Sequence, residues 1–490
     1  MKQKKKIIIL GAGFSSLSAS CYLAKAGYDV TVLEKNDAVG GRARQLKRDG
    51  FIFDMGPTFY WMPDVFERFF LDFNQQVSDY YELLRLDPSY SVCFGQEDFV
   101  TLSADIGEIK ATFEKNESGS GKRLTDFLSK AESNYDIAVK DLVYKPGEHL
   151  FEIVNSKTIG RLGAFTKSIS KDVAAYVSNP KLRKILEFPV LFLGAKPSTT
   201  PSFYNFMNYA DFMLGTWHPK GGMFEVADGI RRLAEQLGVK IMVNAPVDDV
   251  LIEQSQIKKV YSGGQEFMCD IVLSGADYHH TEQLLPKSYR QYSEKYWDKK
   301  TFAPSALLFY VGFDKKLDHL AHHSLFFDVD FDQHASAIYD KPQYPDDPLF
   351  YASFPSVSDE TVAPEGKEAG IFLIPLAPGL EDNEAIRQRY FDIIISRLES
   401  TTKQNIRSHV LFSESFSVND FVSTYNSYKG NAYGLANTLL QTHVLRPKLR
   451  SRKVKNLFFT GQLTVPGPGV PPSLISGKIV SDLIIKYYAQ

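Results

Sequence analysis

The residues with the clearest chemical meaning form a glycine-rich turn near the start of the chain. Gly11 and Gly13 follow directly after an apolar run at 7–10. Ser16 takes the place of the third glycine in a G-x-G-x-x-G pattern, and Glu34 follows about 20 residues after the turn. The two glycines permit a tight turn and let the backbone approach an anion, while the later carboxylate can accept hydrogen bonds from ribose hydroxyls. This spacing predicts a site for a dinucleotide.

The elements around this turn are those that would position it. The run 7–10 predicts a parallel strand buried on both faces, 16–26 predicts a helix, and 30–33 predicts a second strand. The start of such a helix offers free N–H groups and a partial positive charge to a phosphate. Ser16 is small enough for a position that serves helix–strand packing, and the acid disfavours a 2′-phosphate. A complete βαβ unit is far more specific than the glycine pattern alone.

Two short segments bear on the choice between NAD and FAD. The segment Gly40-Gly41-Arg42 combines a loop backbone that can lie against a cofactor with a fixed positive charge. The segment 53–58 is a strand end followed by a turn. Taken singly, each is also typical of an ordinary turn. In this order they resemble the opening of the FAD-containing amine oxidase and phytoene desaturase superfamily. That resemblance implies that the first segment lies beside the pyrophosphate and the second near the isoalloxazine.

The C-terminal region carries a second pattern of the same kind. An apolar strand is expected at 457–460, and it is followed by Gly461, by a Gly/Pro-rich loop at 466–473 and by a helix from about Leu474. A loop followed by a helix N-terminus again makes an anion site. The segment resembles the terminal motif of the same superfamily. The resemblance implies that the loop holds the ribityl chain and flavin edge, while the helix start faces the pyrophosphate.

These motifs define the predicted cofactor site. The amine oxidases that resemble this chain include several that attach FAD through a cysteine near the C-terminal motif, but no cysteine follows Cys269 here. We therefore expect FAD to be bound noncovalently. The residues expected to contact it are Gly11, Gly13, Phe14, Ser15, Ser16, Glu34, Lys35, Gly41, Arg42, Gly56, Pro57, Thr58, Val247, Gly461, Gly469 and Val470.

The middle of the chain indicates a branch of the superfamily. The segment 215–223 contains a W-x-P-x-G-G pattern, and 269–277 reads as a buried strand that ends in Ser-Gly-Ala-Asp. Both resemble the bacterial-type (CrtI-type) carotenoid desaturases. The resemblance covers nearly the whole chain and is densest at 7–60, 215–280 and 455–480. It implies an α/β fold, with a Rossmann-like FAD-binding domain of the GR2/amine-oxidase type and an inserted mixed α+β substrate domain.

The domain boundaries follow from where the nucleotide motifs occur. We expect a discontinuous FAD-binding domain from 1–85, 215–290 and 450–490. The segments 86–214 and 291–449 carry no nucleotide motif and are expected to bind substrate and contact a membrane. Within them, the aromatic stretches 188–194 and 203–209 are interpreted as core packing rather than as the lining of a tunnel.

The resemblance also implies an activity. It predicts an FAD-dependent oxidoreductase that removes two hydrogens from an acyclic or monocyclic C40 carotenoid, one as hydride to the flavin and one as a proton. Segments 60–63 and 216–219 are nearest to the 1-hydroxycarotenoid 3,4-desaturases, and a terminal hydroxyl would need a polar partner such as His218 or Tyr60. The alternatives are a phytoene desaturase, a flavin amine oxidase and a non-enzymatic escort protein of the same fold. The intact Glu34 and glycine motifs argue against the last.

Candidate catalytic residues are few. His218 stands in a motif expected near the flavin and is the candidate proton acceptor, because a histidine titrates near neutrality. Asp54 is the second candidate. The adjacent pairs at 279–280 and 322–323 are histidines, but neighbouring side chains are expected to diverge on a strand or helix. No metal site is therefore predicted.

Composition narrows the remaining possibilities. The 490 residues are 44% hydrophobic and 23% charged, and 56 Lys and Arg nearly balance 58 Asp and Glu. Such a balance provides no field that would recruit nucleic acid. No run of 18 apolar residues occurs, and the three cysteines are widely separated. A carotenoid is insoluble in water, so we expect a cytoplasmic protein that contacts a membrane surface peripherally. The sequence assigns neither the electron acceptor nor the oligomeric state.

Overall fold

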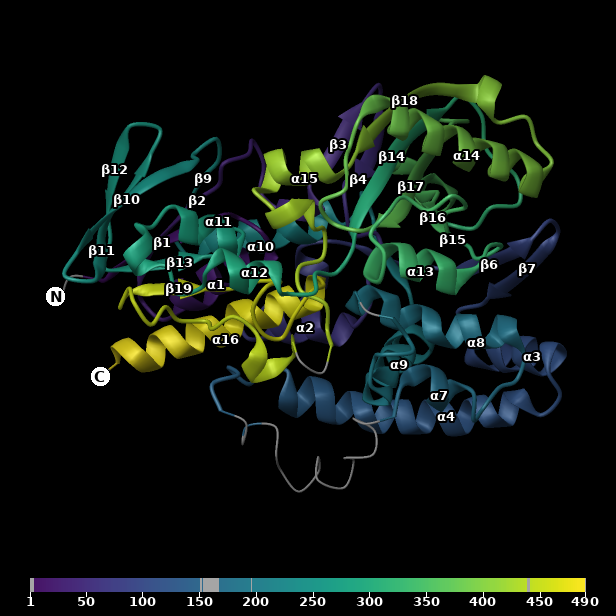
Figure 1. Cartoon of the computed structure of the whole chain (residues 1–490), viewed down its shortest axis with the longest axis horizontal. Coiled ribbons are helices and arrows are strands. Elements are labelled where there is room, and N and C mark those ends of the chain that lie inside the picture. Colours follow the sequence, from purple (N-terminus) through teal and green to yellow (C-terminus); the bar gives the residue numbers. More distant parts are fainter. Residues whose placement is uncertain (1–3, 150–151, 153–166, 195, 439–440, 490) are drawn as a thin grey trace.

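A five-stranded parallel sheet forms the part of the fold that holds both ends of the described chain (Figure 1). The computed structural model describes residues 4–149, 152, 167–194, 196–438 and 441–489. All neighbouring strands in this sheet pair in parallel. In spatial order the strands are β19 (Leu457–Phe459), β13 (Ile271–Ser274), β1 (Lys6–Leu10), β2 (Asp29–Leu33) and β9 (Lys240–Met242).

The apolar run of β1 is explained by burial on both faces of this sheet. Ile7 and Ile9 face a core shared with helices, whereas Ile8 and Leu10 face a second core, since side chains alternate along a strand. The first face is covered by α1 (Phe14–Lys25), α2 (Pro63–Leu71), α10 (Phe224–Gln236) and α16 (Val470–Tyr488). The second is covered by β10 (Val247–Glu253), β11 (Gln256–Ser262), β12 (Gln265–Met268), α11 (Tyr278–Gln283) and α12 (Glu294–Asp298).

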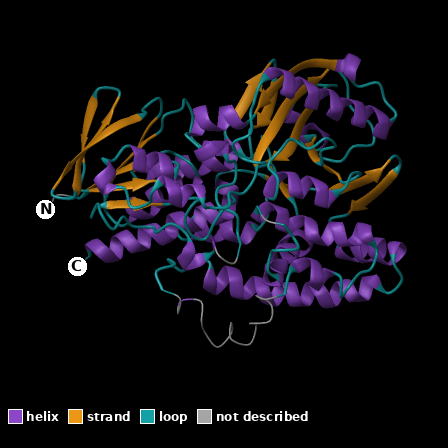
Figure 2. Cartoon of the chain, viewed as in Figure 1, coloured by secondary structure: helices purple, strands orange, loops and turns teal. Residues whose placement is uncertain are grey.

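The second large sheet has seven strands and is mixed. Every neighbouring pair is antiparallel except β15 with β6, which is parallel. Figure 2 shows these strands grouped apart from the first sheet. In spatial order they are β18 (Val410–Phe416), β14 (Ser305–Phe313), β17 (Glu368–Leu376), β16 (Phe350–Ser353), β15 (His323–Phe326), β6 (Tyr90–Gly95) and β7 (Asp98–Leu102).

Different elements cover the two faces of the seven-stranded sheet. Leu307, Phe309 and Val311 of β14 pack with α14 (Glu384–Thr402). The alternate residues of β14 pack against the ribbon of β3 (Gln45–Arg48) and β4 (Phe51–Asp54), and against α15 (Val418–Tyr425). β5 (Leu83–Arg85) and β8 (Trp217–Pro219) form a separate two-stranded antiparallel sheet, and α13 (Phe331–Tyr339) lies beside β17.

A layer of helices lies beneath the seven-stranded sheet in Figure 1. Tyr90 and Val92 of β6 share a core with these helices. The longest of these helices is α4, which continues as a π-helical turn over Asp136–Leu142. The layer consists of α3 (Ile106–Asn116), α4 (Ser120–Tyr135), α7 (Ile169–Val173), α8 (Pro180–Glu187) and α9 (Phe206–Tyr209).

The α/β fold with a Rossmann-like nucleotide domain and an inserted mixed domain is confirmed. All strands of the five-stranded sheet come from the segments 1–85, 215–290 and 450–490, and all strands of the seven-stranded sheet come from 86–214 and 291–449. The β3–β4 ribbon crosses this division, because Phe51 and Phe53 pack against the second sheet.

The C-terminal helix begins earlier than expected. The predicted start near Leu474 is wrong, because α16 begins at Val470 and contains Pro471 and Pro472 in its first turn. Proline is tolerated there since the N–H groups of a first turn have no partner within the helix. No helix in the described part of the chain is long and apolar enough to cross a membrane.

Candidate functional site

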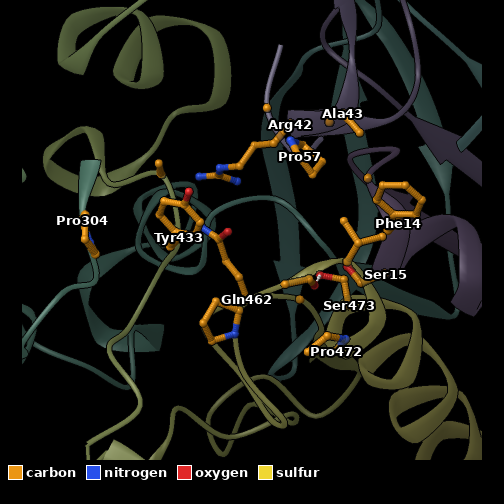
Figure 3. A pocket seen from close by; sticks show the side chains of 18 of the residues that line it. Phe14, Ser15, Arg42, Ala43, Pro57, Pro304, Tyr433, Gln462, Pro472 and Ser473 are labelled. Carbon is orange, nitrogen blue, oxygen red and sulfur yellow. Dashed lines mark hydrogen bonds between the residues drawn. The ribbon is translucent and has the colours of Figure 1, made fainter. Parts of the chain in front are cut away.

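A cavity of about 820 Å³ opens at the carboxyl ends of β1, β2 and β13. It is lined by Gly11 after β1, Glu34 after β2 and Gly275 after β13. Ligands of open parallel sheets bind at this edge, where the strands end and helices begin. Figure 3 shows Arg42 and Pro57 on one side of the space, and Phe14 and Ser15 on another. The same cavity extends between the seven-stranded sheet and the helical layer.

The glycines of the opening motif bring two loops together at the start of α1. Gly13 pairs with Gly40 in an isolated parallel bridge, and Gly40 N–H donates to the carbonyl of Ala12 at 2.9 Å. Gly41 adopts a φ of 57°, and a Cβ there would lie 3.2 Å from the Gly13 Cα. A Cβ on Gly13 itself would meet nothing within 4 Å. The backbone at the helix start is therefore open toward the cavity.

Two helix N-termini meet at this point. Neither α1 nor α16 has a side-chain cap, and neither has an acidic residue in its first turn. The Ser18 hydroxyl of α1 donates to the carbonyl of Leu474 in α16 at 2.9 Å, which fixes the two helices side by side. Gly469 and Val470 line the cavity at the start of α16. Both uncapped N-termini provide positive potential for a diphosphate, and α1 adds N–H donors. In α16 the first turn offers the N–H of Val470, since Pro471 and Pro472 have none.

Glu34 is buried at the end of β2 and lines the cavity. Its carboxylate accepts hydrogen bonds from Ala12 N–H at 2.7 Å and from both Asn36 N–H and Asn36 Nδ2 at 2.9 Å. These bonds fix the orientation of the carboxylate relative to the glycine turn. Each carboxylate oxygen has two acceptor sites, so Glu34 retains capacity for a ribose hydroxyl.

Arg42 supplies a positive charge at the cavity. Its Nη2 donates to the Ser427 hydroxyl at 3.1 Å and the Asn431 carbonyl at 3.3 Å, while its buried Nε has no hydrogen-bond partner among the described residues. Burial lowers the pKa of Arg42, and nearby Asp277 opposes that shift. Figure 3 shows the guanidinium directed into the cavity. An incompletely paired buried cation is suited to an anionic ligand.

The second opening segment lies against the first. A Cβ at Gly56 would lie 2.3 Å from the Arg42 carbonyl oxygen, so only glycine lets the two loops approach this closely. Gly56, Pro57 and Thr58 all line the cavity. The Thr58 hydroxyl is hydrogen-bonded to the Tyr351 hydroxyl at 2.7 Å, which joins this loop to β16 of the second sheet.

Most of the residues predicted to contact the cofactor line this cavity. Phe14, Ser15, Lys35, Val247 and Gly461 do so together with the residues already described. The ammonium of Lys35, however, donates to the Ser423 carbonyl at 2.7 Å and to Asn426 Oδ1 at 3.1 Å. The side chain of Lys35 therefore holds the neighbouring loop.

Ser16 does not line the cavity. A Cβ at Gly275 would lie 2.0 Å from Ser16 Oγ, so this side chain packs between α1 and the end of β13. The position serves helix–strand packing, as the sequence pattern indicated, and the Ser16 side chain is fully buried.

The two candidate catalytic residues lie behind the cavity wall. His218 is 1% exposed, and its Nε2 is 2.9 Å from Asp359 Oδ2. Asp54 accepts from Met223 N–H at 2.9 Å, and burial raises its pKa to about 6. Neither side chain is among the described residues that line the cavity. These positions give both residues a role in holding loops and do not support direct contact with a substrate.

Tyr60, the other candidate partner for a substrate hydroxyl, is also fully buried. Its hydroxyl is 3.0 Å from the hydroxyl of Tyr81 and does not line the cavity. Its neighbours in sequence, Phe59 and Trp61, do line the cavity. Successive side chains of an extended backbone point to opposite sides, so Tyr60 points away from the cavity that its neighbours line.

Several cavity residues carried no usable signal in the sequence. Tyr433 faces the cavity from a loop that no motif identifies, and Pro304 lies beside it (Figure 3). Gln462 also faces the cavity; it follows Gly461 in the C-terminal motif but was not among the predicted contacts. Asp277 and His280 were detectable in principle. They follow β13, and the carboxyl ends of adjacent parallel strands meet at one edge of a sheet.

The part of the cavity beyond the nucleotide motifs is predominantly hydrophobic. The aromatic stretches interpreted as core contribute directly to its wall, so that interpretation was wrong for several of their residues. Phe188 and Phe206 are buried against other aromatic rings on one side and face the cavity on the other. The wall includes Phe59, Trp61, Val139, Leu142, Phe188, Leu191, Phe203, Phe206, Met207, Phe327, Phe331, Ile338 and Leu349.

The adjacent histidines at 322 and 323 also differ from expectation. Their ring centroids are 4.4 Å apart with an edge-to-face arrangement, so the predicted divergence of the two side chains is wrong. His322 precedes β15 and His323 begins it, and the irregular backbone at the strand start lets both rings enter one buried cluster. The His218 ring lies 4.7 Å from that of His322.

The described residues contain no cluster of three or more His, Cys, Asp or Glu side chains suited to a metal ion. Cys21, Cys93 and Cys269 are buried and free, and none of them lines the cavity. Burial raises the pKa of the Cys93 thiol to about 11. No thiol is therefore placed to attach a cofactor covalently.

Comparison with known proteins agrees with this geometry. A family model described as flavin containing amine oxidoreductase matches residues 14–485. The chain belongs to this family. The match extends from the first residue of α1 into α16, so it includes both helices that meet at the cavity. Members of the family are flavin enzymes, and FAD is the cofactor of this chain.

Individual relatives span the whole chain. The chain is 41% identical over 486 residues to a carotenoid 3,4-desaturase from Haloarcula japonica, with 98% of each chain covered. It is 34% identical to a 4,4′-diapophytoene desaturase (4,4′-diaponeurosporene-forming) from Staphylococcus aureus, with 99% of each covered. A solved oxidoreductase from Methanosarcina mazei shares the fold, with a TM-score of 0.64 at 16% identity over 97% of this chain and 100% of that one.

The residues present fit FAD. The orphaned Nε of Arg42, the open face of Gly13 and the two uncapped helix starts are features that a diphosphate would satisfy. Glu34 lies at the strand end where the adenosine ribose is bound in dinucleotide folds. The loop residues Gly461 and Gly469 line the same cavity from the C-terminal side.

Proposed function

We propose that this protein is an FAD-dependent carotenoid desaturase that introduces a 3,4 double bond into a hydroxylated acyclic or monocyclic C40 carotenoid. The observation that carries the proposal is the 41% identity to a carotenoid 3,4-desaturase over 98% of both chains. The second relative, a diapophytoene desaturase, acts on a similar class of hydrocarbon by its name. The hydrophobic wall of the cavity is consistent with a long polyene.

In this proposal the side chains and backbone of the protein bind FAD and orient the hydrocarbon. Arg42 and the starts of α1 and α16 would hold the diphosphate of FAD, and Glu34 would hold the adenosine ribose. When bound, the flavin supplies the two-electron acceptor that a desaturation needs. The wall formed by Phe188, Phe206 and their neighbours excludes water and aligns the hydrocarbon beside the loop at 56–58.

We propose further that the protein is cytoplasmic and takes its substrate from a membrane surface without crossing the membrane. A C40 hydrocarbon resides in lipid, and the described helices include no membrane-spanning candidate. Co-sedimentation with phosphatidylcholine vesicles tests this idea, and a protein that stays in the supernatant in both flavin states contradicts it.

The direct test of function is a substrate panel. The purified protein is supplied with FAD and incubated with vesicles that contain phytoene, a hydroxylated acyclic carotenoid or a hydroxylated monocyclic carotenoid. We expect a product whose absorption lies at longer wavelength from a hydroxylated substrate, because each new double bond extends the conjugated system. Preference for phytoene would favour the alternative phytoene desaturase.

Two controls separate the other members of this fold. A panel of amines is incubated under the same conditions, and their oxidation without carotenoid conversion would identify an amine oxidase. A colourless protein that gains no flavin absorbance after addition of FAD would identify a non-enzymatic relative and contradict the proposal.

A further inference from the structure

A cluster of three buried histidines lies directly behind one wall of the cavity. The cluster consists of His218, His322 and His323, and each of them is at most 3% exposed. The ring of His322 contacts the rings of both of the others. His323 stacks on Phe59 with ring centroids 3.9 Å apart, and Phe59 lines the cavity. The cluster is therefore separated from the cavity by a single layer of side chains.

Two hydroxyl groups connect the cavity to this cluster. Thr58 and Tyr351 both line the cavity, and their hydroxyls are 2.7 Å apart. The Tyr351 hydroxyl is also 2.7 Å from His323 Nδ1. Thr58 follows the loop that approaches the cofactor motif, whereas Tyr351 belongs to β16 of the second sheet. The hydroxyl pair thus stands where the cofactor part of the cavity meets its hydrophobic part.

The cluster also reaches the protein surface. The His322 ring is in contact with that of His323, and His322 Nδ1 is hydrogen-bonded to the Ser358 hydroxyl. Ser358 is exposed. Hydrogen bonds therefore join the cavity to His323 through Tyr351, and join His322 to the exposed Ser358. Between the two histidines the contact is edge to face, without a hydrogen bond.

This route has unused capacity for protons. The Nε2 atoms of both His322 and His323 are buried and have no hydrogen-bond partner among the described residues. His334, another buried histidine at the cavity, is different, since its two ring nitrogens bond to the Pro375 carbonyl and the Leu349 N–H at 2.8 Å each. Burial lowers the pKa of His323 well below its usual value, so the ring is neutral at rest and holds an added proton only briefly.

We propose that Tyr351, His323 and His322 form the exit path for the proton that desaturation releases into the cavity. The inference rests on the proposed function, because only a reaction that removes hydrogen from a hydrocarbon produces a proton in a compartment that excludes water. His218 and Asp54, the two candidate catalytic residues of the sequence, do not line the cavity.

Desaturation removes two hydrogens from neighbouring carbons of the substrate. One substrate C–H bond is lost as hydride, with its two electrons, to the bound FAD. The neighbouring C–H bond breaks, its electron pair forms the new C=C bond, and its proton goes to the Tyr351 oxygen. Tyr351 gives its own hydroxyl proton to His323 Nδ1. The proton on the opposite nitrogen of His323 then passes to His322 Nε2, and the proton on His322 Nδ1 leaves through Ser358 to water. This transfer requires one of the two rings to turn, because neither Nε2 has a hydrogen-bond partner among the described residues.

The test compares single-residue variants from separate elements. Tyr351→Phe, His323→Gln and His322→Gln are purified with FAD and assayed on the hydroxylated acyclic carotenoid in phosphatidylcholine vesicles. We expect kcat to fall about 100-fold with KM unchanged, since positioned proton transfer contributes on the order of 100-fold or more. The solvent deuterium effect on kcat should become smaller in His323→Gln than in the natural protein, because the exchangeable O–H and N–H protons of the path no longer move when the C–H bond, which does not exchange with solvent, is broken.

A matched control removes a buried hydroxyl elsewhere. Tyr390 is 1% exposed, its hydroxyl donates to the Pro345 carbonyl, and it does not line the cavity. Tyr390→Phe should retain the natural kcat and solvent deuterium effect. Flavin absorbance and thermal unfolding establish that each variant is folded and loaded.

The outcomes separate the two proposals. If the natural protein converts a carotenoid and any folded relay variant keeps kcat within about threefold, the exit path is wrong and the proposed function stands. If the natural protein converts none of the carotenoids, the proposed function fails and the exit path fails with it. A parallel rise in KM or loss of flavin would indicate a structural role and would also overturn the path.

Discussion

Gly477 of α16 lies against Ser15 of α1, so closely that a Cβ at Gly477 would come within 2.4 Å of the Ser15 carbonyl oxygen. The same Cβ would lie 2.8 Å from Ser18. Glycine at this crossing lets the first helix and the last helix of the chain approach each other. Their N-termini then face one cavity from two sides.

Gly477→Ala is therefore expected to weaken the cofactor site from a distance. The added methyl group forces the two helices apart, and overpacking of this kind costs about 1–3 kcal/mol of stability. We expect a lower midpoint of thermal unfolding and a lower ratio of flavin to protein absorbance after purification. Lys486→Ala on the exposed side of the same helix is the control. Unchanged flavin retention in a destabilised Gly477→Ala would show that the helix crossing does not set the site.

Arg42→Gln should reduce FAD affinity without destabilising the protein that lacks FAD. Loss of a charge-assisted hydrogen bond is expected to weaken binding about 10- to 100-fold, as measured by titration of FAD. The unloaded protein should be at least as stable, because an incompletely paired buried cation has been removed. Arg44→Gln, which removes an arginine paired with the exposed Asp37, should leave FAD affinity unchanged.

Asp54→Asn should change how stability depends on pH. The folded pKa of Asp54, about 6, lies above its usual value of 3.8, so burial of the carboxylate costs stability as pH rises through this window. Asparagine keeps an acceptor for Met223 N–H but cannot ionise. The stability of the variant relative to the natural protein should therefore increase by roughly 1–2 kcal/mol between pH 5 and pH 8.

Urea unfolding of both FAD-loaded proteins at each pH measures this difference. Asp49→Asn, at an exposed turn, should show no such pH-dependent gain. A difference between Asp54→Asn and the natural protein that stays constant from pH 5 to pH 8 would mean that Asp54 is not buried as the structure has it.

Ala335→Phe should obstruct the substrate part of the cavity and spare the cofactor part. Ala335 lies on α13 and lines the cavity, so a larger side chain there reduces the space for a hydrocarbon. We expect a raised KM for the carotenoid with unchanged flavin absorbance. Gln333→Phe, exposed on the same helix, should leave both unaltered. If Ala335→Phe turns over the carotenoid with a natural KM, this branch of the cavity does not hold the substrate.

The local parts of the site were predictable from sequence. The strand, turn and helix around Gly11 and Gly13 depend on neighbours within one βαβ unit, and the structure has β1, α1 and β2 within two residues of the expected bounds. Glu34 and Arg42 lie at the cavity because strand ends and glycine turns fix their positions locally. The uninterrupted apolar run of β1 likewise follows from burial on both faces of the sheet.

The less local predictions failed for identifiable reasons. His218 stands in a motif beside the cavity, but its ring turns toward Asp359, which is distant in sequence and could not be located without the fold. Phe188 was interpreted as core, yet a side chain at a cavity wall and one in a core are equally apolar. The start of α16 was placed too late because its two prolines resemble a loop.

The sequence by itself determined the cofactor class and the family, because the glycine turn, the acid after the second strand and the C-terminal loop each act through local backbone geometry. Only the tertiary structure decided which side chains face the cavity and which lie behind it. It brought Tyr351 against Thr58 and the ring of His218 against that of His322, and these contacts join strands and loops that are far apart in the chain. Their chemistry depends on shared burial, which no local pattern encodes.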